Sequence, residues 1–425
     1  MVPVCGMVNR NQKRIDDIEH FNKRPLKAPL QMERGWACLP VGRVRSNKTK
    51  RYFSNAYKQI FHSMHRLIKS ILFFLFLIST VTQLAAQNPD SMLLKNYRPK
   101  SIYKIPVTKV AKAKYPVIDM HSHPYAETDE EIQRWLKTID QCGIQKTTIL
   151  TYSTGTRFDS LYKLYSKYGD RFELWCGFDY TGYNEPGWSD KAVKELIRCH
   201  AVGAKGVGEL GDKGLGELYS HPLPAIGMHI DDARMKPLLK KCGELKMPIS
   251  IHVAEPMWMY EPMDSTNDGL MNAYTWKVDQ SKANLLSHQQ LVQTLENAVR
   301  DNPKTIFIAC HLANCEYDLS ILGNLFKKYK NLYADIAARY AEIAPIPRYM
   351  LSFITQFQDR LVYGTDMGYD PSMYEMTFRI LETNDEHFYE IERTGYHWPL
   401  YGLGLSQQIL QKIYHANAAR LRKGL

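Results

Sequence analysis

Two features that would suggest a nucleic-acid-binding or membrane protein are missing from most of this 425-residue sequence. Residues 1–87 hold 15 Lys and Arg against 4 Asp and Glu, so the remainder holds 40 of each and has no net charge. Without a basic field beyond residue 87, nucleic acid is not expected as a partner. The dense apolar run from Ile71 to Val81 is shorter than the roughly 20 residues that span a membrane.

Cys-x-x-Cys pairs are missing as well, and several cysteines lie in apolar stretches. We therefore expect buried free thiols at the six cysteines beyond residue 87, although an exported chain would permit a disulfide. These cysteines are Cys142, Cys176, Cys199, Cys242, Cys310 and Cys315.

The N-terminal region nevertheless has the layout of an export signal. Within residues 64–87, Arg66 and Lys69 precede the apolar run, and Ala85 and Ala86 offer small residues for cleavage. We expect an exported protein, periplasmic or secreted, whose only membrane contact is this segment. Anchoring in the membrane by residues 71–86 is the alternative.

The flanking segments are expected to have no fold of their own. Residues 1–63 are basic, polar and without helical periodicity, so we expect them to be disordered or to precede a true start of translation at Met64. Residues 88–115 are expected to be a linker to a catalytic body over residues 116–425.

From residue 116 onward, short β-rich runs alternate with helical stretches of about ten to fifteen residues. The predicted strands cover 116–120, 146–150, 172–178, 204–210, 248–253, 305–310, 331–337 and 360–366. Eight such units predict an α/β fold, a parallel (β/α)₈ TIM barrel. A doubly wound open sheet is the alternative, because periodicity cannot show closure. The long connections 254–286 and 384–404 are candidate lids or substrate walls.

The motif PVIDMHSH, residues 116–123, ends the first predicted strand with two histidines one residue apart. Alternate residues of a strand face the same way, so His121 and His123 would aim their imidazoles in one direction. Two neutral imidazoles suit a divalent transition metal, although two polar residues in a turn would have the same sequence.

Other predicted strands end in similar side chains: Glu209 on the fourth, His252 on the fifth, His311 on the sixth and Asp366 on the eighth. In a barrel, all of them would point into one mouth together with the first pair of histidines. No structural role requires such a gathering, so the sequence predicts a metal site there.

The spread motif HxH…H…H…D resembles that of the amidohydrolase superfamily, in its amidohydrolase-related branch. The resemblance covers about residues 116–425, including the closing KIYHANAARL, which is similar to the branch's terminal helix with its Asn-Ala pair. It implies that His311 binds a second metal or acts as a polarising or acid–base residue. The residues that it implies around the metal are His121, His123, His252 and Asp366.

The fourth strand is where binuclear relatives have a bridging carboxylated Lys or a Glu, and here two residues compete for that position. Lys205 and Glu209 have the same strand parity but are about 13 Å apart, so only one can lie at the mouth. Glu209 is at the carboxyl end of the strand, and we expect it to be a ligand. Lys205 is expected deep in the barrel or at its floor.

The resemblance and this ligand set lead us to expect a metal-dependent hydrolase that attacks an amide, ester or related bond of a small molecule. They imply one or two divalent ions, zinc first, with manganese, iron and cobalt as alternatives. The metal would acidify a water, Asp366 would take its proton and pass it to the leaving group, and the metal or His311 would polarise the substrate oxygen. Asp119 is a candidate to orient a ligand histidine. Association into a homo-oligomer stays open.

Four further residues with polar or ionisable side chains lie in the connections, and we expect them at the surface or in contact with substrate rather than as metal ligands. They are His221, His229, Glu255 and His397.

Two other functions are weighed against hydrolysis. A decarboxylase of the same branch would use one metal and a cation for the substrate carboxylate, which Arg339 could supply. A catalytically inactive, exported binding protein is the third possibility, but a decayed site would be expected to have lost a ligand.

Overall fold

The computed structural model describes residues 62–73, 88–282 and 285–422, and the chain divides into the units Met1–Gln87 and Asn88–Leu425. In the first unit, residues 62–73 form a helix. The predicted extension over residues 1–61 and the predicted signal segment beyond residue 73 lie outside the described residues. Within the described ranges, no helix is both long and apolar enough to span a membrane.

The unit Asn88–Leu425 contains eight strands that pair in parallel, each overlapping a predicted strand. They are β1 (Val117–Ser122), β2 (Ile144–Leu150), β3 (Phe172–Trp175), β4 (Val207–Asp212), β7 (Ile249–Val253), β8 (Phe307–Ala309), β9 (Leu332–Asp335) and β10 (Leu361–Val362). An antiparallel hairpin of β5 (Glu217–Leu218) and β6 (Ala225–Ile226) follows β4. It was not predicted, because strands of two residues leave no alternation in the sequence.

Hydrogen bonds at two seams close these strands into a barrel. Regular pairing gives the orders β1-β2-β3 and β10-β9-β8-β7-β4. Between β3 and β4, the Cys176 N–H donates to the Gly206 carbonyl (3.0 Å) and the Gly208 N–H donates to the Cys176 carbonyl (2.8 Å). Between β10 and β1, the Met120 N–H donates to the Tyr363 carbonyl (2.9 Å). The predicted (β/α)₈ barrel is therefore confirmed, and the open sheet was the wrong alternative.

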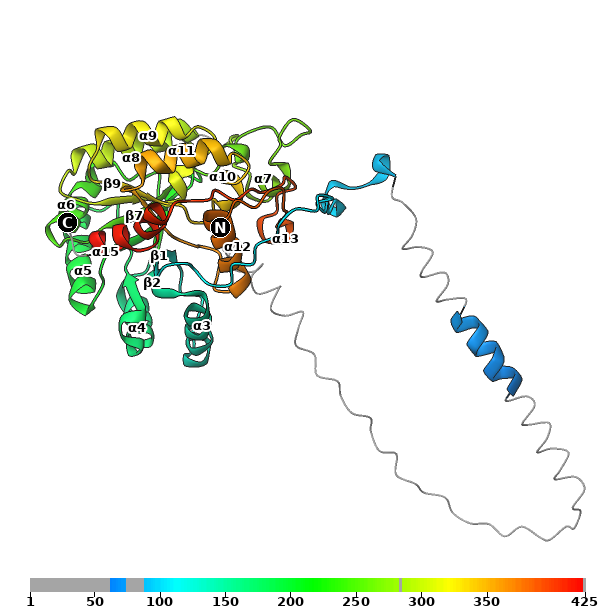
Figure 1. Cartoon of the computed structure of the whole chain (residues 1–425). Helices are drawn as coiled ribbons and strands as arrows, with labels where there is room; N and C mark the ends of the chain where they lie inside the picture. Colours follow the sequence, from blue (N-terminus) through cyan, green and yellow to red (C-terminus); the bar gives the residue numbers. More distant parts are fainter. Residues whose placement is uncertain (1–61, 74–87, 283–284, 423–425) are drawn as a thin grey trace, which may run out of the picture. The chain divides into compact units, whose positions relative to one another are not determined.

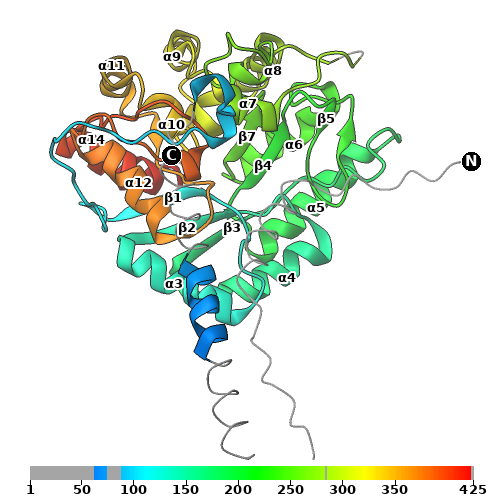
Figure 2. The same cartoon turned by 90° about the vertical axis from the view of Figure 1, so that its right-hand side faces the viewer.

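One principal helix follows each barrel strand, and these helices lie outside the strands (Figures 1 and 2). They are α3 (Asp129–Cys142), α4 (Gly155–Tyr165), α5 (Trp188–Val202), α6 (Lys236–Glu244), α8 (His288–Asp301), α9 (Leu319–Lys328), α11 (Pro347–Phe357) and α12 (Pro371–Glu382). The local sequence explains their ends, as α3 illustrates. Thr128 and Glu131 form a capping box at its start, and Gly143 ends it with φ 83°, a conformation that favours glycine.

Shorter helical segments occupy the connections and the end of the chain. They are η1 (Pro89–Ser91), η2 (Leu94–Asn96), η3 (Ser166–Arg171), η4 (Ala233–Met235), η5 (Met257–Met259), α7 (Leu270–Trp276), η6 (Cys310–Asn314), α10 (Tyr340–Ile343), α13 (Ile391–Thr394), α14 (Gln407–Gln411), η7 (Lys412–Ala416) and α15 (Asn417–Arg422). The long connections predicted as lids or walls thus contain η5 and α7 in one case and α13 in the other.

A small apolar cluster gathers side chains from six strands and from α15, separately from the large core between strands and helices. Its strand members are Ile118, Met120, Leu150, Trp175, Ile308, Tyr333 and Val362. Because they come from six of the eight barrel strands and pack together, we assign them to the barrel interior. Asn417 joins the terminal helix to the barrel, since its Nδ2 donates to the carbonyls of Gln358 (2.7 Å) and Leu361 (2.8 Å).

The six cysteines of this unit are all buried and free, as the sequence predicted. The predicted linker, residues 88–115, is tied to the connection 384–404. The Thr108 backbone N–H and hydroxyl donate to the Asp385 carboxylate at 2.8 and 2.6 Å, and Arg98 pairs with Glu392 at 2.5 Å.

Candidate metal centre

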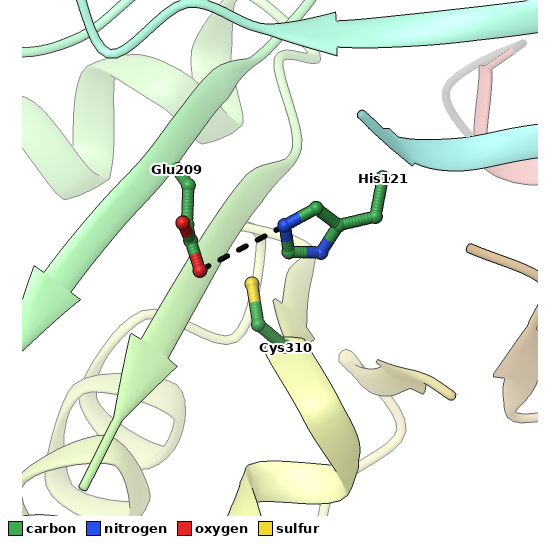
Figure 3. A group of neighbouring side chains, drawn as sticks. All are labelled: His121, Glu209 and Cys310. Carbon is green, nitrogen blue, oxygen red and sulfur yellow. Dashed lines mark ion pairs between the residues drawn. The ribbon is translucent and has the colours of Figure 1, made fainter. Parts of the chain in front are cut away.

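The structure brings the six predicted ligands together at the carboxyl ends of the barrel strands, with Glu209 among the four imidazoles. Figure 3 shows the carboxylate of Glu209 and the ring of His121 facing each other. The Glu209 oxygens lie 3.0 Å from His252 Nδ1, 3.3 Å from His311 Nε2, 3.5 Å from His123 Nε2 and 3.8 Å from His121 Nε2. One carboxylate thus touches every histidine of the predicted set.

Asp366 forms the second carboxylate of the cluster. Its oxygens lie 3.0 Å from His123 Nε2, 3.6 Å from His311 Nε2 and 3.8 Å from His121 Nε2. The Asp366 side chain is 22% exposed, against 9% for Glu209. Asp366 therefore lies on the open side of the cluster, where the Tyr125 hydroxyl approaches it at 3.4 Å.

The backbone turns sharply where several strands end at this cluster. Ala254, His311, Ala338 and Asp366 come shortly after β7, β8, β9 and β10, and each has a φ between 50° and 59°. For residues other than glycine this conformation costs about 1–3 kcal/mol each, a strain that gathers at functional sites. The strained residues therefore lie where the chain directs side chains into the mouth of the barrel.

Hydrogen bonds from outside the cluster fix three of the imidazoles. The Nδ1 atoms of His123 and His311 lie 3.0 Å from the Leu150 carbonyl and 2.8 Å from the Ala337 carbonyl. His121 Nδ1 lies 2.9 Å from Asp335 Oδ2. Carbonyls can only accept, so the Nδ1 atoms of His123 and His311 carry hydrogen and their Nε2 atoms present lone pairs to the cluster.

Asp335 was not singled out in the sequence, although it lies within the predicted strand NLYADIA, and it is the last residue of β9. Its Oδ1 also accepts the backbone N–H of His311 at 2.8 Å. Asp119, the residue proposed for an orienting role, instead accepts the backbone N–H groups of His121 (3.2 Å) and Thr365 (3.1 Å). Asp119 therefore holds the backbone beside the ligands, and Asp335 holds an imidazole.

The donor set fits a divalent metal. Across the described residues, His121 Nε2 and His252 Nε2 are buried and have no hydrogen-bond partner. Of four groups of three described residues whose ligand atoms lie within 4.8 Å of one another, two consist only of predicted ligands: His121, His123 and Asp366 form one, and Glu209, His252 and His311 form the other. Imidazole nitrogens and carboxylates at this spacing are the ligands that transition metals take in proteins.

Both carboxylates are held ionised. Burial raises the pKa of Glu209, but the positive charge of Lys213 and the hydrogen bond from His252 outweigh burial, so this pKa lies well below its ordinary value. Burial also raises the pKa of Asp366, but the neighbouring His121 outweighs burial, so this pKa is lowered as well. Two negative charges are therefore available to bound cations.

Three further side chains surround the cluster. The Cys310 thiol lies with His121 and Glu209 (Figure 3), and burial raises its pKa, so the thiol is neutral. Glu255 Oε2 is 3.5 Å from His252 Nε2, so this residue belongs to the cluster's surroundings rather than to the surface. Lys213, just after β4, is close enough for the charges of Glu209, Glu255 and Asp366 to raise its pKa.

Other residues singled out in the sequence have their contacts with residues outside the six predicted ligands. His221 contacts Tyr219, His229 pairs with Asp212 at 2.8 Å, and His397 stacks on Tyr97. Lys205 is exposed and precedes the amino end of β4, so the expected position deep in the barrel was wrong, and the alternative position on the side of the barrel floor fits better. Arg339 is buried, and its guanidinium donates to Asn314 Oδ1 and to the Ala338 carbonyl.

Comparison with known proteins places the chain in a family. Residues 118–421 match the family model described as Amidohydrolase, of the amidohydrolase 2 branch. No curated protein matches the sequence.

Similar solved structures include a dihydroxybenzoic acid decarboxylase from Polaromonas sp. JS666 with bound manganese and the inhibitor 2-nitroresorcinol (14% identity, 73% of this chain and 97% of that chain, TM-score 0.45). A probable 2-pyrone-4,6-dicarboxylic acid hydrolase from Acinetobacter baumannii with citric acid bound is also similar (12% identity, 72% of this chain and 99% of that chain, TM-score 0.43). At such TM-scores these likenesses assign no function. The match to the family model extends over residues 118–421, most of the chain, and the protein therefore belongs to the amidohydrolase family, an enzyme family of the amidohydrolase superfamily.

Proposed function

We propose that this protein is a metal-dependent hydrolase that cleaves an amide, ester or related bond of a small molecule at a centre of two divalent ions. The observation that carries this proposal is the contact of Glu209 with the ring nitrogens of all four histidines, at 3.0 to 3.8 Å. A carboxylate among so many ligands is suited to bridge two ions. One ion would be held by His121, His123 and Asp366 and the other by His252 and His311, with Glu209 shared.

Bound ions would supply Lewis acidity and lower the pKa of a water towards neutrality. Zinc is our first proposal for their identity, because imidazole and carboxylate ligands suit it. Asp366 is the most exposed of the six ligands, so its carboxylate can accept a proton from the attacking water and return that proton to the leaving group. The Tyr125 hydroxyl, which donates to Asp366 Oδ1, helps to orient this carboxylate.

His311 is better suited to bind a metal than to act as an acid. Its Nδ1 hydrogen donates to the Ala337 carbonyl, so its Nε2 carries a lone pair, which faces Glu209 at 3.3 Å and Asp366 at 3.6 Å. A lone pair held in this direction can bind a cation but cannot donate a proton.

Lys213 supplies a positive charge at the same mouth. The charges of Glu209, Glu255 and Asp366 raise its pKa, which keeps the ammonium protonated. We propose that it stabilises the negative charge that develops on the substrate oxygen.

Decarboxylation is the second candidate, and Lys213 is the observation that favours it. A decarboxylase needs a cation for the substrate carboxylate, and Arg339 is occupied by Asn314 and lies between Glu316 and Glu342 at 4.0 and 3.9 Å. Lys213 could hold the carboxylate instead.

The two functions give different products. We would deplete the purified protein of metal with a chelator, reload it with zinc or manganese, and assay a panel of amides and esters together with hydroxybenzoates. A metal-restored release of acid from an amide or ester supports hydrolysis. A metal-restored release of CO₂, without hydrolysis of any ester or amide, would replace it with decarboxylation.

A further inference from the structure

A pocket of about 400 Å³ lies over the carboxyl ends of β7, β8 and β9, on the barrel face that carries the metal centre. Its walls include Trp258 from the connection after β7, Glu316 and Tyr317 from that after β8, Glu342 from that after β9, and Trp398 from the connection 384–404. None of the six proposed metal ligands lines it. The pocket is therefore distinct from the metal centre, although both open at the same end of the barrel.

Two buried carboxylates line this pocket without sufficient hydrogen-bond donors. Glu316 is 2% exposed and Glu342 is 7% exposed. Neither oxygen of Glu316 accepts a hydrogen bond from any residue the structure describes, and the same holds for Oε2 of Glu342. A buried carboxylate in this condition is costly unless something outside the chain satisfies it.

Arg339 does not donate hydrogen bonds to the carboxylates of Glu316 and Glu342. It lies 4.0 Å from Glu316 and 3.9 Å from Glu342, beyond hydrogen-bond distance, and donates instead to Asn314 and to the Ala338 carbonyl. Its single positive charge also acts on Glu255, beside His252. One guanidinium thus lies between Glu316 and Glu342, and it also acts on Glu255, which has Lys213 as a second cation. Burial raises the pKa of Glu316 to about 7 in spite of Arg339, and burial raises the pKa of Glu342 as well.

Aromatic rings complete the pocket and are themselves held in place. Trp258 and Trp398 lie with ring centroids 5.6 Å apart, and Tyr396 stacks on Trp398 at 4.0 Å. Trp398 Nε1 donates to the Ala341 carbonyl (3.0 Å), and the Tyr396 hydroxyl donates to Glu342 Oε1 (3.1 Å). Indole faces beside carboxylates form a favourable environment for a cation attached to an apolar body.

We propose that this pocket binds an organic cation, with an ammonium or guanidinium group hydrogen-bonded to Glu316 and Glu342 and an apolar or aromatic body against Trp258 and Trp398. Such a group has N–H donors for the unsatisfied carboxylate oxygens and the charge that Arg339 does not provide. The pocket and the metal centre lie at the same end of the barrel. Glu255 lies 3.5 Å from His252 Nε2, and Arg339 interacts electrostatically with Glu255 as well as with Glu316 and Glu342. The cation is therefore one end of the substrate, a step that rests on the proposed hydrolase function.

The experiment measures binding of benzylammonium to the full-length protein by calorimetry at pH 7.5, with the change in tryptophan fluorescence as a second readout. Benzyl alcohol is the matched probe of nearly the same shape without charge. We expect the wild type to bind benzylammonium at least tenfold more tightly than benzyl alcohol. The variants Glu316→Gln and Glu342→Gln should each weaken benzylammonium binding at least tenfold, so that the affinities for benzylammonium and benzyl alcohol become similar. Glu130→Gln, at an exposed position on α3, is the matched control and should change neither affinity.

Equal affinity of the wild type for both probes, or unchanged benzylammonium affinity in the folded glutamine variants, would overturn the proposal. The comparison of probes on the wild type decides the question even where a variant does not fold. Binding is measured with and without metal, so it does not depend on catalysis. Benzylammonium binding without metal-dependent hydrolysis would contradict the hydrolase function alone, whereas hydrolysis without benzylammonium binding would contradict the pocket alone.

Discussion

Asp335 joins His121 to His311: one carboxylate oxygen lies 2.9 Å from His121 Nδ1, and the other accepts the backbone N–H of His311 at 2.8 Å. These two histidines stand in the separate groups that we assign to the two ions. Asp335 itself is 1% exposed and lies behind the imidazole of His121. The relative positions of the two proposed ion sites therefore depend on a residue that is not itself one of the proposed ligands.

Replacing Asp335 by Asn should weaken metal binding without removing a proposed ligand. An amide has a single oxygen acceptor, so it can satisfy His121 or the His311 N–H but not both. We expect metal affinity to fall about 10- to 100-fold, measured by competition with a chromogenic chelator. Asp170→Asn, at a fully exposed position, is the control and should bind metal as the wild type does. Wild-type affinity in Asp335→Asn would show that this carboxylate has no part in positioning the ligands.

Lys213→Met should separate the two candidate reactions by its kinetics. If the ammonium stabilises charge that develops during hydrolysis, kcat should fall about 10- to 1,000-fold with little change in KM. If it holds a substrate carboxylate, KM should rise instead. Metal content should equal that of the wild type in either case, and Lys213→Arg should recover part of the activity. Unchanged kinetics in Lys213→Met would remove this residue from the mechanism.

Glu316→Gln should change how stability depends on pH. Burial raises the pKa of this carboxyl from 4.5 to about 7 in the folded protein, against the opposing charge of Arg339 and with smaller contributions from Glu342 and Glu255. The folded state thus retains a proton that the unfolded state loses, so stability falls as pH rises from about 4.5 to 7 and the full cost remains above 7. That cost is up to about 3 kcal/mol.

The glutamine variant should therefore be more stable than the wild type at pH 8 and of similar stability at pH 4.5. Urea unfolding at both pH values checks this, with Glu130→Gln as the control. A variant equally destabilised at both pH values would mean that the Glu316 carboxylate has a stabilising partner in the folded protein and is not an unsatisfied buried group. Benzylammonium should raise the stability of the wild type at pH 8 but not that of the variant.

If the protein is exported, as we propose, the mature protein should have a defined N-terminus. Cleavage near Ala86 would remove residues 1–86 and leave the barrel with its preceding segment, and mass spectrometry of protein recovered outside the cytoplasm would show that N-terminus. Recovery only in membranes, with residues 71–81 intact, would support the anchor instead.

The sequence was sufficient to predict the barrel because each βα unit leaves its own periodic pattern. It could not show closure, since the bonds of Cys176 to Gly206 and of Met120 to Tyr363 join segments whose contact no local pattern encodes. Lys205 illustrates a limit of strand boundaries. The strand begins only at Val207, so equal parity with Glu209 did not bring Lys205 into the barrel.

The site, too, could be predicted only in part. Residues with metal-binding side chains next to strand ends could be predicted to gather, because barrel topology alone brings them together. Asp335 also ends a strand, but a lone aspartate has no spacing signal. Glu316 and Glu342 were not recognised, because their importance lies in missing hydrogen bonds, which only the three-dimensional structure reveals.

The central claim is that Glu209 bridges two ions, and metal stoichiometry tests it most directly. The wild type and Glu209→Gln would be reloaded with excess zinc or manganese, freed of unbound ion, and measured by elemental analysis, with Glu130→Gln as the control. Removing the shared charge leaves the two cations less compensated, so the weaker one should leave. We predict about two ions per chain in the wild type and the control and about one in Glu209→Gln, with a steep loss of hydrolysis. A replete wild type that holds one ion, and a variant that holds the same number, would contradict the account.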